Sequence, residues 1–193
     1  MAGRLAVDFG TCNTVVALWD EGSASGHTVA LTELSIPQIH QEHEFHMVPS
    51  LIHYDGTRLF TGRQVHENEV LRSAPATFRW MKSYIANNMK LPRRVDGRTI
   101  DFLQAGGDFL KQVIIEAGGL VDFAEEEVCL TAPVEAFEHY QNWLDDTAQQ
   151  AGIARPVYLD EASAAALGMP HMSGPAMSSW FSISGEARLM SRW

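Results

Sequence analysis

The first third of the chain alternates apolar and polar positions in a pattern that predicts three strands. Residues 4–9 and 13–19 are two apolar runs, and residues 28–34 form a third. Gly10-Thr11-Cys12-Asn13 separates the first two runs, and a glycine beside small and Asx residues is typical of a tight turn. The pattern therefore predicts a β-meander with a hairpin turn at residues 10–13.

The middle of the chain is irregular. Prolines punctuate residues 37–98, short strand signals occur at residues 51–54, and Asp55-Gly56 predicts a turn. A helix is expected over residues 78–87.

From residue 101 the pattern changes to alternating helices and strands. Apolar residues three or four apart predict helices over residues 102–117 and 136–151, and short apolar runs at 128–131 and 157–159 predict strands. Asp160 is a suitable N-cap for an alanine-rich helix that ends before Gly168. The carboxyl-terminal half is therefore expected to be α/β.

Composition restricts the classes of function. The 193 residues are 46% hydrophobic and 20% charged, which is ordinary globular composition. A formal net charge of -10 disfavours nonspecific binding to nucleic acid or to an anionic membrane, since Lys and Arg drive both. Cys12 and Cys129 form no C-x-x-C motif, and the amino-terminal residues do not resemble a signal peptide. We therefore expect a cytoplasmic protein with reduced thiols.

The opening turn also suggests anion chemistry. A tight glycine turn can direct several backbone N–H groups at one anion. Asp8 directly precedes the turn, and a magnesium ion that keeps most of its waters needs only one or two carboxylates besides phosphate. The residues at 8–13 thus fit a phosphate and magnesium site, and taken alone they fit an ordinary hairpin equally well.

A second candidate site is a histidine cluster, His40, His43 and His46, with glutamates between them. Imidazoles and carboxylates are ligands of zinc. The spacing of three suits a helix, but the flanking prolines disfavour one and no H-E-x-x-H signature is present. We expect a solvated loop or an edge strand here, with a zinc site as the alternative.

Four segments in order carry a resemblance to a known family. They are Asp8-Phe9-Gly10-Thr11-Cys12-Asn13-Thr14, Val48-Pro49-Ser50-Leu51-Ile52 followed by Phe60-Thr61-Gly62, Thr131-Ala132-Pro133-Val134 with Phe137, and Ala151-Gly152-Ile153 leading to Asp160-Glu161-Ala162-Ser163-Ala164-Ala165-Ala166-Leu167-Gly168. Together they resemble the nucleotide-binding domain of DnaK-type heat-shock chaperones, within the actin-like ATPase superfamily.

The resemblance implies an α/β fold, a ribonuclease-H-like lobe whose mixed sheet is flanked by helices. Residues 1–36 and 99–172 would form this lobe, residues 37–98 an inserted small α+β subdomain, and residues 173–193 match nothing in the family.

The resemblance also implies roles for individual residues. Asp8 would hold the waters of Mg²⁺, Gly10, Thr11, Cys12 and Asn13 would cradle the phosphates of ATP or ADP, and Glu161 would lie near the metal and the attacking water. Pro133 resembles the proline that relays the nucleotide state. His66 stands at the position of the family's essential lysine, and a neutral imidazole cannot replace an ammonium beside phosphate.

The family pattern stops before the chain does. After Gly168 the family continues into a second glycine-rich phosphate loop and a second lobe, whereas this chain continues through Ser173 to Trp193. We therefore expect a truncated chaperone lobe with at most weak binding of magnesium and nucleotide, and little or no ATP hydrolysis.

Two other functions stay open. A lobe without its partner lobe would expose apolar surface, so a non-enzymatic module that binds protein clients or associates with itself is one alternative. Sugar and acyl kinases of the same superfamily also begin with an acidic residue and a Gly-Thr hairpin, and are a more distant alternative.

Overall fold

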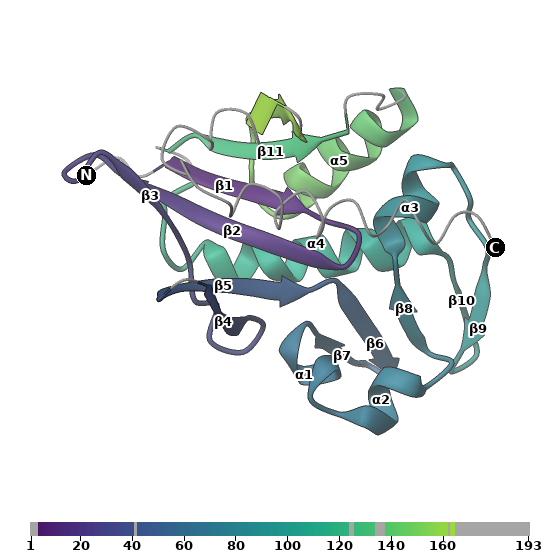
Figure 1. The fold of residues 1–193 in the computed structure, drawn as a ribbon. Coiled ribbons are helices and arrows are strands. Elements are labelled where there is room, and N and C mark those ends of the chain that lie inside the picture. Colours follow the sequence, from purple (N-terminus) through teal and green to yellow (C-terminus); the bar gives the residue numbers. More distant parts are fainter. Residues whose placement is uncertain (1–3, 41, 124–125, 134–137, 162, 165–193) are drawn as a thin grey trace.

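A seven-stranded sheet forms the centre of the computed structural model, which describes residues 4–40, 42–123, 126–133, 138–161 and 163–164 (Figure 1). The strand order is β12-β11-β1-β2-β5-β4, and β3 also pairs with β2. The strands are β1 (Arg4–Phe9), β2 (Asn13–Asp20), β3 (Ser25–Thr28), β4 (Ile36–His40), β5 (His43–Pro49), β11 (Val128–Ala132) and β12 (Pro156–Asp160).

The sheet is mixed, as the family resemblance implies. β1 is antiparallel to β2 and parallel to β11, and β11 is parallel to β12. Val7 of β1 lies beside Leu130 of β11, and Thr131 lies beside Leu159 of β12. The carboxyl ends of β1, β11 and β12 therefore lie side by side, and we call this end of the three strands the carboxyl edge of the sheet.

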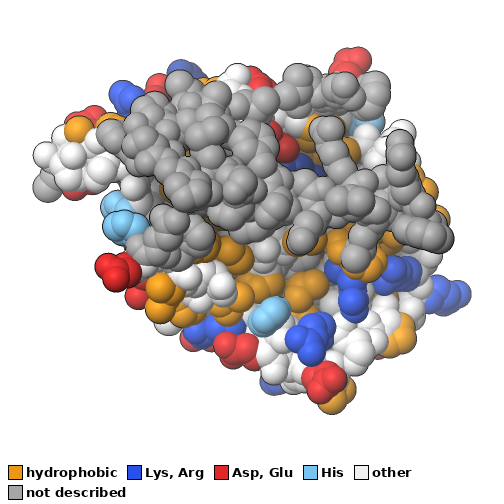
Figure 2. Space-filling view, viewed as in Figure 1, with side chains coloured by type: hydrophobic (Ala, Val, Ile, Leu, Met, Phe, Trp, Pro, Cys, Tyr) orange, Lys and Arg blue, Asp and Glu red, His pale blue; other side chains and the backbone are white. Residues whose placement is uncertain are grey.

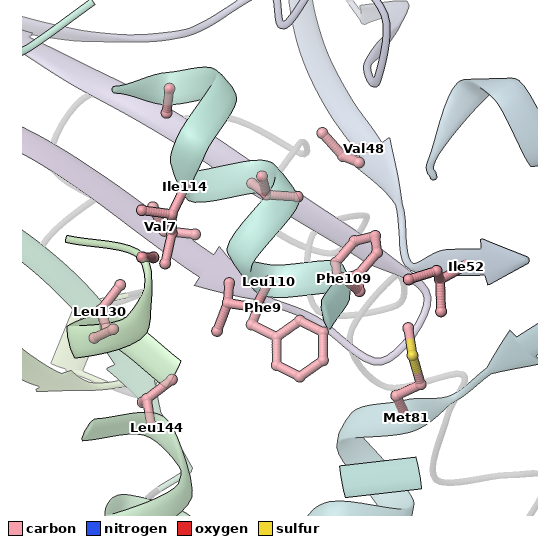
Figure 3. Close-up of a cluster of buried hydrophobic side chains, with 14 of the residues drawn as sticks. Val7, Phe9, Val48, Ile52, Met81, Phe109, Leu110, Ile114, Leu130 and Leu144 are labelled. Carbon is pink, nitrogen blue, oxygen red and sulfur yellow. The ribbon is translucent and has the colours of Figure 1, made fainter. Parts of the chain in front are cut away.

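Two long helices pack together behind the sheet: α4 (Phe102–Ala117) and α5 (Glu138–Gln150). Figure 1 shows α4 running behind β1 and β2, and Figure 3 shows Phe9 and Phe109 among the buried side chains between them. The ring of Phe9 lies 5.8 Å from the rings of both Phe109 and Trp143. Phe9 of β1 therefore packs against both helices.

The segment after β5 builds two small sheets and three short helices. β6 (Leu51–Asp55), β7 (Arg58–Thr61) and β8 (Thr77–Arg79) form one sheet, and β9 (Arg93–Val95) and β10 (Arg98–Ile100) form the other. The helices are α1 (Arg63–His66), α2 (Glu69–Ser73) and α3 (Met81–Ala86). Ile52, Phe78 and Ile85 belong to the same buried cluster as Phe109, so a single core joins this segment to the main sheet.

The α/β class and most expected elements are confirmed, and the structure differs from the expectation at three places. The expected strand at 28–34 is instead β3 followed by a turn, in which the N–H groups of Leu34 and Ser35 donate to the carbonyl of Leu31. Leu31 and Leu34 are buried from this turn, which explains their apolar character without a strand. β4 and β5, which fall within the expected insertion, join the main sheet where Thr14 pairs with Val48.

The expected helix at 78–87 begins three residues late. Residues 77–79 pair with β6 as β8, and Trp80 then adopts a left-handed conformation (φ 58°) before α3 starts at Met81. Strand pairing with β6 thus overrides the local helical pattern.

The N-cap at Asp160 is confirmed, because the Ser163 N–H donates to Asp160 Oδ1 at 2.7 Å. The rest of that expected helix, the tail 173–193, Val134 and Phe137 lie outside the described residues. None of the described helices is both long enough and apolar enough to cross a membrane.

Acid pH is expected to destabilise the fold through His53. Its Nδ1 lies 2.8 Å from Thr77 Oγ1, and Thr77 donates to the carbonyl of Leu71, so His53 is the donor in its neutral form. Burial lowers the pKa of His53 from 6.5. The unfolded chain therefore binds the proton more readily, and this contribution is complete above pH 6.5 and is lost as the pH falls below it.

The measurement is the free energy of unfolding between pH 8 and pH 5 for the wild type and His53→Asn, which keeps an N–H donor at the Nδ1 position. The wild type should lose more stability below about pH 6.5 than the variant does. An identical pH dependence in the two proteins would contradict this role for His53.

Candidate active site

The carboxyl edge of the sheet gathers the polar groups of the candidate site. Asp8, one residue before the end of β1, is exposed, and the hydroxyl of the buried Thr131 on β11 donates to its Oδ1 at 2.5 Å. Glu161 directly follows β12 at the same edge. The parallel alignment of the three strands brings these residues to the same end of the sheet. Ligand sites of open α/β sheets commonly lie at the carboxyl ends of their strands.

A buried lysine from α3 completes this group. Lys82 Nζ forms an ion pair with Glu161 Oε1. The side chain of Lys82 is only 9% exposed and that of Glu161 is 37% exposed. Burying an ammonium to this extent is costly unless it is paired. The carboxylate of Glu161 therefore stabilises the buried positive charge of Lys82. α3 therefore brings a positive charge to the edge of the main sheet.

A buried tyrosine hydroxyl lies in the same electrostatic environment. Tyr140, in the first turn of α5, is fully buried, and its hydroxyl has no hydrogen-bond partner among the described residues. Burial raises the pKa of Tyr140, and the negative charges of Glu161 and Asp8 raise it further. Tyr140 is therefore a neutral hydrogen-bond donor at physiological pH.

Ser50 holds the opening turn from the inside. Its hydroxyl donates to the carbonyl of Gly10 at 2.8 Å, and its N–H donates to the carbonyl of Cys12 at 2.8 Å. The buried Thr14 hydroxyl lies 3.0 Å from Ser50 Oγ and donates to it, since the Ser50 proton is already used. Two carbonyls of the turn thus point inward to Ser50.

The same geometry leaves amide donors in the turn. The N–H groups of Thr11 and Cys12 donate to no acceptor in the described part of the chain. At Gly10 a Cβ atom would lie 2.1 Å from the carbonyl oxygen of Asn13, so only glycine fits there. The turn is therefore a closed backbone loop with free donors next to Asp8, which is the arrangement that binds anions.

The other expected site residues lie in different environments. Cys12 is exposed, and desolvation raises the pKa of its thiol, which is therefore protonated at neutral pH. Pro133 is half-buried directly after β11. His66 is exposed at the end of α1, where its carbonyl accepts from Arg72, and no contact between described residues joins it to Asp8 or Glu161. The cation at this edge is Lys82.

The histidine cluster lies away from this edge. His40 ends β4, the outermost strand, whereas His43 and His46 are in β5, which pairs with both β4 and β2, so only His40 lies on the expected edge strand. His46 Nε2 lies 3.4 Å from Glu44 Oε1. Considering only side chains that the structure describes, no group of three His, Cys, Asp or Glu residues is placed to hold a metal ion.

Comparison with known proteins adds no relative: no protein-family model matches this sequence, and no curated protein is significantly similar to it. The chemistry of the site must therefore be argued from its residues.

Replacing Ser50 is expected to destabilise the protein more than the loss of one hydrogen bond would. Ser50→Ala leaves the Gly10 carbonyl and the Thr14 hydroxyl without their partner, and each buried unpaired group costs about 1–3 kcal/mol. Ser35→Ala is the matched control, because the buried Ser35 hydroxyl makes a single bond, to the Leu31 carbonyl. Urea unfolding should show the larger loss for Ser50→Ala, and equal losses would contradict the account.

The two partners of the ion pair should differ in their effect on stability. Glu161→Gln leaves a nearly buried ammonium unpaired, and we expect it to cost about 1–3 kcal/mol. Lys82→Met replaces the ammonium with an apolar group and leaves a carboxylate that water reaches, so the loss should be smaller. Urea unfolding of both variants tests this order, and a larger loss for Lys82→Met would contradict it.

Proposed function

We propose that this chain is a DnaK-like ATPase lobe that binds magnesium and ATP or ADP at the carboxyl edge of its main sheet. The observation that carries the proposal is the meeting of Asp8, Thr131 and the Lys82–Glu161 pair beside a glycine turn with free amide donors. The strand arrangement supports it, since three antiparallel strands followed by two parallel strands are what a ribonuclease-H-like lobe requires.

Each group has a distinct task in this proposal. The Thr11 and Cys12 amides bind phosphate oxygens, as backbone concavities do. Asp8, held by the Thr131 hydroxyl, binds the waters of Mg²⁺, which neutralises phosphate charge when it is bound. Tyr140 keeps a neutral hydroxyl within the electrostatic influence of Glu161 and Asp8. These residues form one side of a nucleotide site.

The proposal includes little or no hydrolysis by this lobe. General-base catalysis would require a carboxylate oxygen free to accept a proton from the attacking water. Lys82 engages Oε1 of Glu161 and holds the carboxylate in the ion pair, so only Oε2 could face the attacking water, and His66 at the expected lysine position lies elsewhere. Lys82 therefore supplies the missing positive charge while it restrains the residue expected to lie near the attacking water.

Titration of the whole chain with MgATP and MgADP tests the proposal by calorimetry and by the shift in melting temperature. Asp8→Asn removes the negative charge that would bind the hydrated metal, and we expect about a tenfold weaker affinity, corresponding to about 1.4 kcal/mol. Asp20→Asn is the control, because Asp20 ends β2 at the opposite end from the Gly10–Asn13 turn and pairs there with Ser25 of β3.

Binding that persists unchanged in Asp8→Asn, or no binding to the wild type at millimolar nucleotide, would contradict the proposal. A magnesium-dependent ATPase activity abolished by Asp8→Asn would contradict the statement on hydrolysis alone.

A further inference from the structure

Positive charge is concentrated in one segment of this acidic protein. Residues 58–98 contain nine of the fourteen Lys and Arg residues and only three of the twenty-four Asp and Glu residues. The segment therefore carries a net charge of +6 in a chain of net charge -10. Figure 2 shows Lys and Arg side chains gathered at the lower right, over this part of the molecule. Such a local field attracts anions to one side of the protein.

A pocket of about 250 Å³ lies within this segment. Its walls include two guanidinium groups, Arg79 and Arg93, and three aromatic rings, those of Trp80, Tyr84 and Phe102. The ring of Tyr84 stacks on that of Phe102 at 3.9 Å, and Trp80 is 47% exposed. The pocket thus combines positive charge with flat apolar surface.

Arg93 is fixed in its orientation before any ligand binds. Its guanidinium carbon lies 4.9 Å from the ring centroids of both Phe78 and Phe102. Nη1 donates to the carbonyl of Thr77 at 3.1 Å, while Nε and Nη2 donate to no acceptor among the described residues. Two donors of an oriented guanidinium are therefore available to an incoming anion.

Arg79 is held in a similar way. Its guanidinium lies 5.7 Å from the Trp80 ring, and Nη2 donates to the carbonyl of Arg72. No carboxylate forms an ion pair with Arg79 or Arg93 in the part of the chain that the structure describes. Both positive charges therefore lack a counter-charge from the described residues.

This chemistry selects a particular class of ligand. Oriented guanidinium groups bind phosphate through paired N–H···O bonds, and two of them suit a dianion better than a carboxylate. The volume lies below the roughly 300–1,000 Å³ typical of ligand pockets, which favours a small ligand. The exposed ring of Trp80 adds a surface on which a planar ring can stack.

We propose that this pocket binds an aryl phosphate monoester, such as a phosphorylated tyrosine side chain, with Arg79 and Arg93 as its phosphate ligands. The site is separate from Asp8 and does not depend on the proposed nucleotide binding.

Titration of the whole chain with phenyl phosphate tests this proposal, read by calorimetry and by the indole N–H resonance of Trp80. Inorganic phosphate and O-phosphoserine are the comparison ligands. We expect saturable binding of phenyl phosphate that is about tenfold weaker in Arg79→Gln, the equivalent of one lost charge-assisted hydrogen bond. Arg79 is chosen because Arg93 packs against the core and its replacement risks unfolding.

Arg58→Gln is the matched control, since Arg58 is exposed in the same basic segment and does not line the pocket. Its affinity should equal that of the wild type. Equal losses in Arg58→Gln and Arg79→Gln would overturn the proposal in favour of general charge attraction. Inorganic phosphate binding as tightly as phenyl phosphate, or no binding at all, would also overturn it.

Discussion

The hydrogen bonds of Ser50 are the constraint on which the rest of the site depends. Ser50 lies between β5, which belongs to the main sheet, and β6, which begins the small sheet. Its hydrogen bonds to the carbonyls of Gly10 and Cys12 attach the turn at residues 10–13 to this junction between β5 and β6. The path of the chain between the sheets and the shape of the turn at residues 10–13 are therefore determined together.

The Lys82–Glu161 ion pair makes the second connection between the two parts of the chain. Lys82 comes from α3, whose neighbouring residues Met81 and Ile85 are fully buried in the common core. Glu161 follows β12 at the carboxyl edge of the main sheet. A change in the charge of Glu161 would therefore weaken its ion pair with Lys82. It would act directly on α3 and on the segment that carries the arginine pocket.

Regular periodicity made most of the fold predictable, and pairing between distant segments explains the failures. The runs at 4–9 and 102–117 are long and strongly patterned, and both formed as expected. Residues 78 and 79 were predicted to be helical because their pairing with β6 cannot be seen in the local sequence. Asp8 and the turn were found from the sequence, whereas Lys82 was missed. Its signal was a single lysine between buried apolar residues, which is ambiguous until the partner Glu161 is placed.

The central claim is that the turn after Asp8 binds phosphate through its backbone. The most direct measurement is the change in backbone amide resonances of the isotopically labelled chain during titration with MgADP. The account predicts saturable shifts centred on Thr11, Cys12 and Asn13 that require magnesium. Shifts confined to other parts of the chain, with these three amides unchanged at saturation, would contradict it.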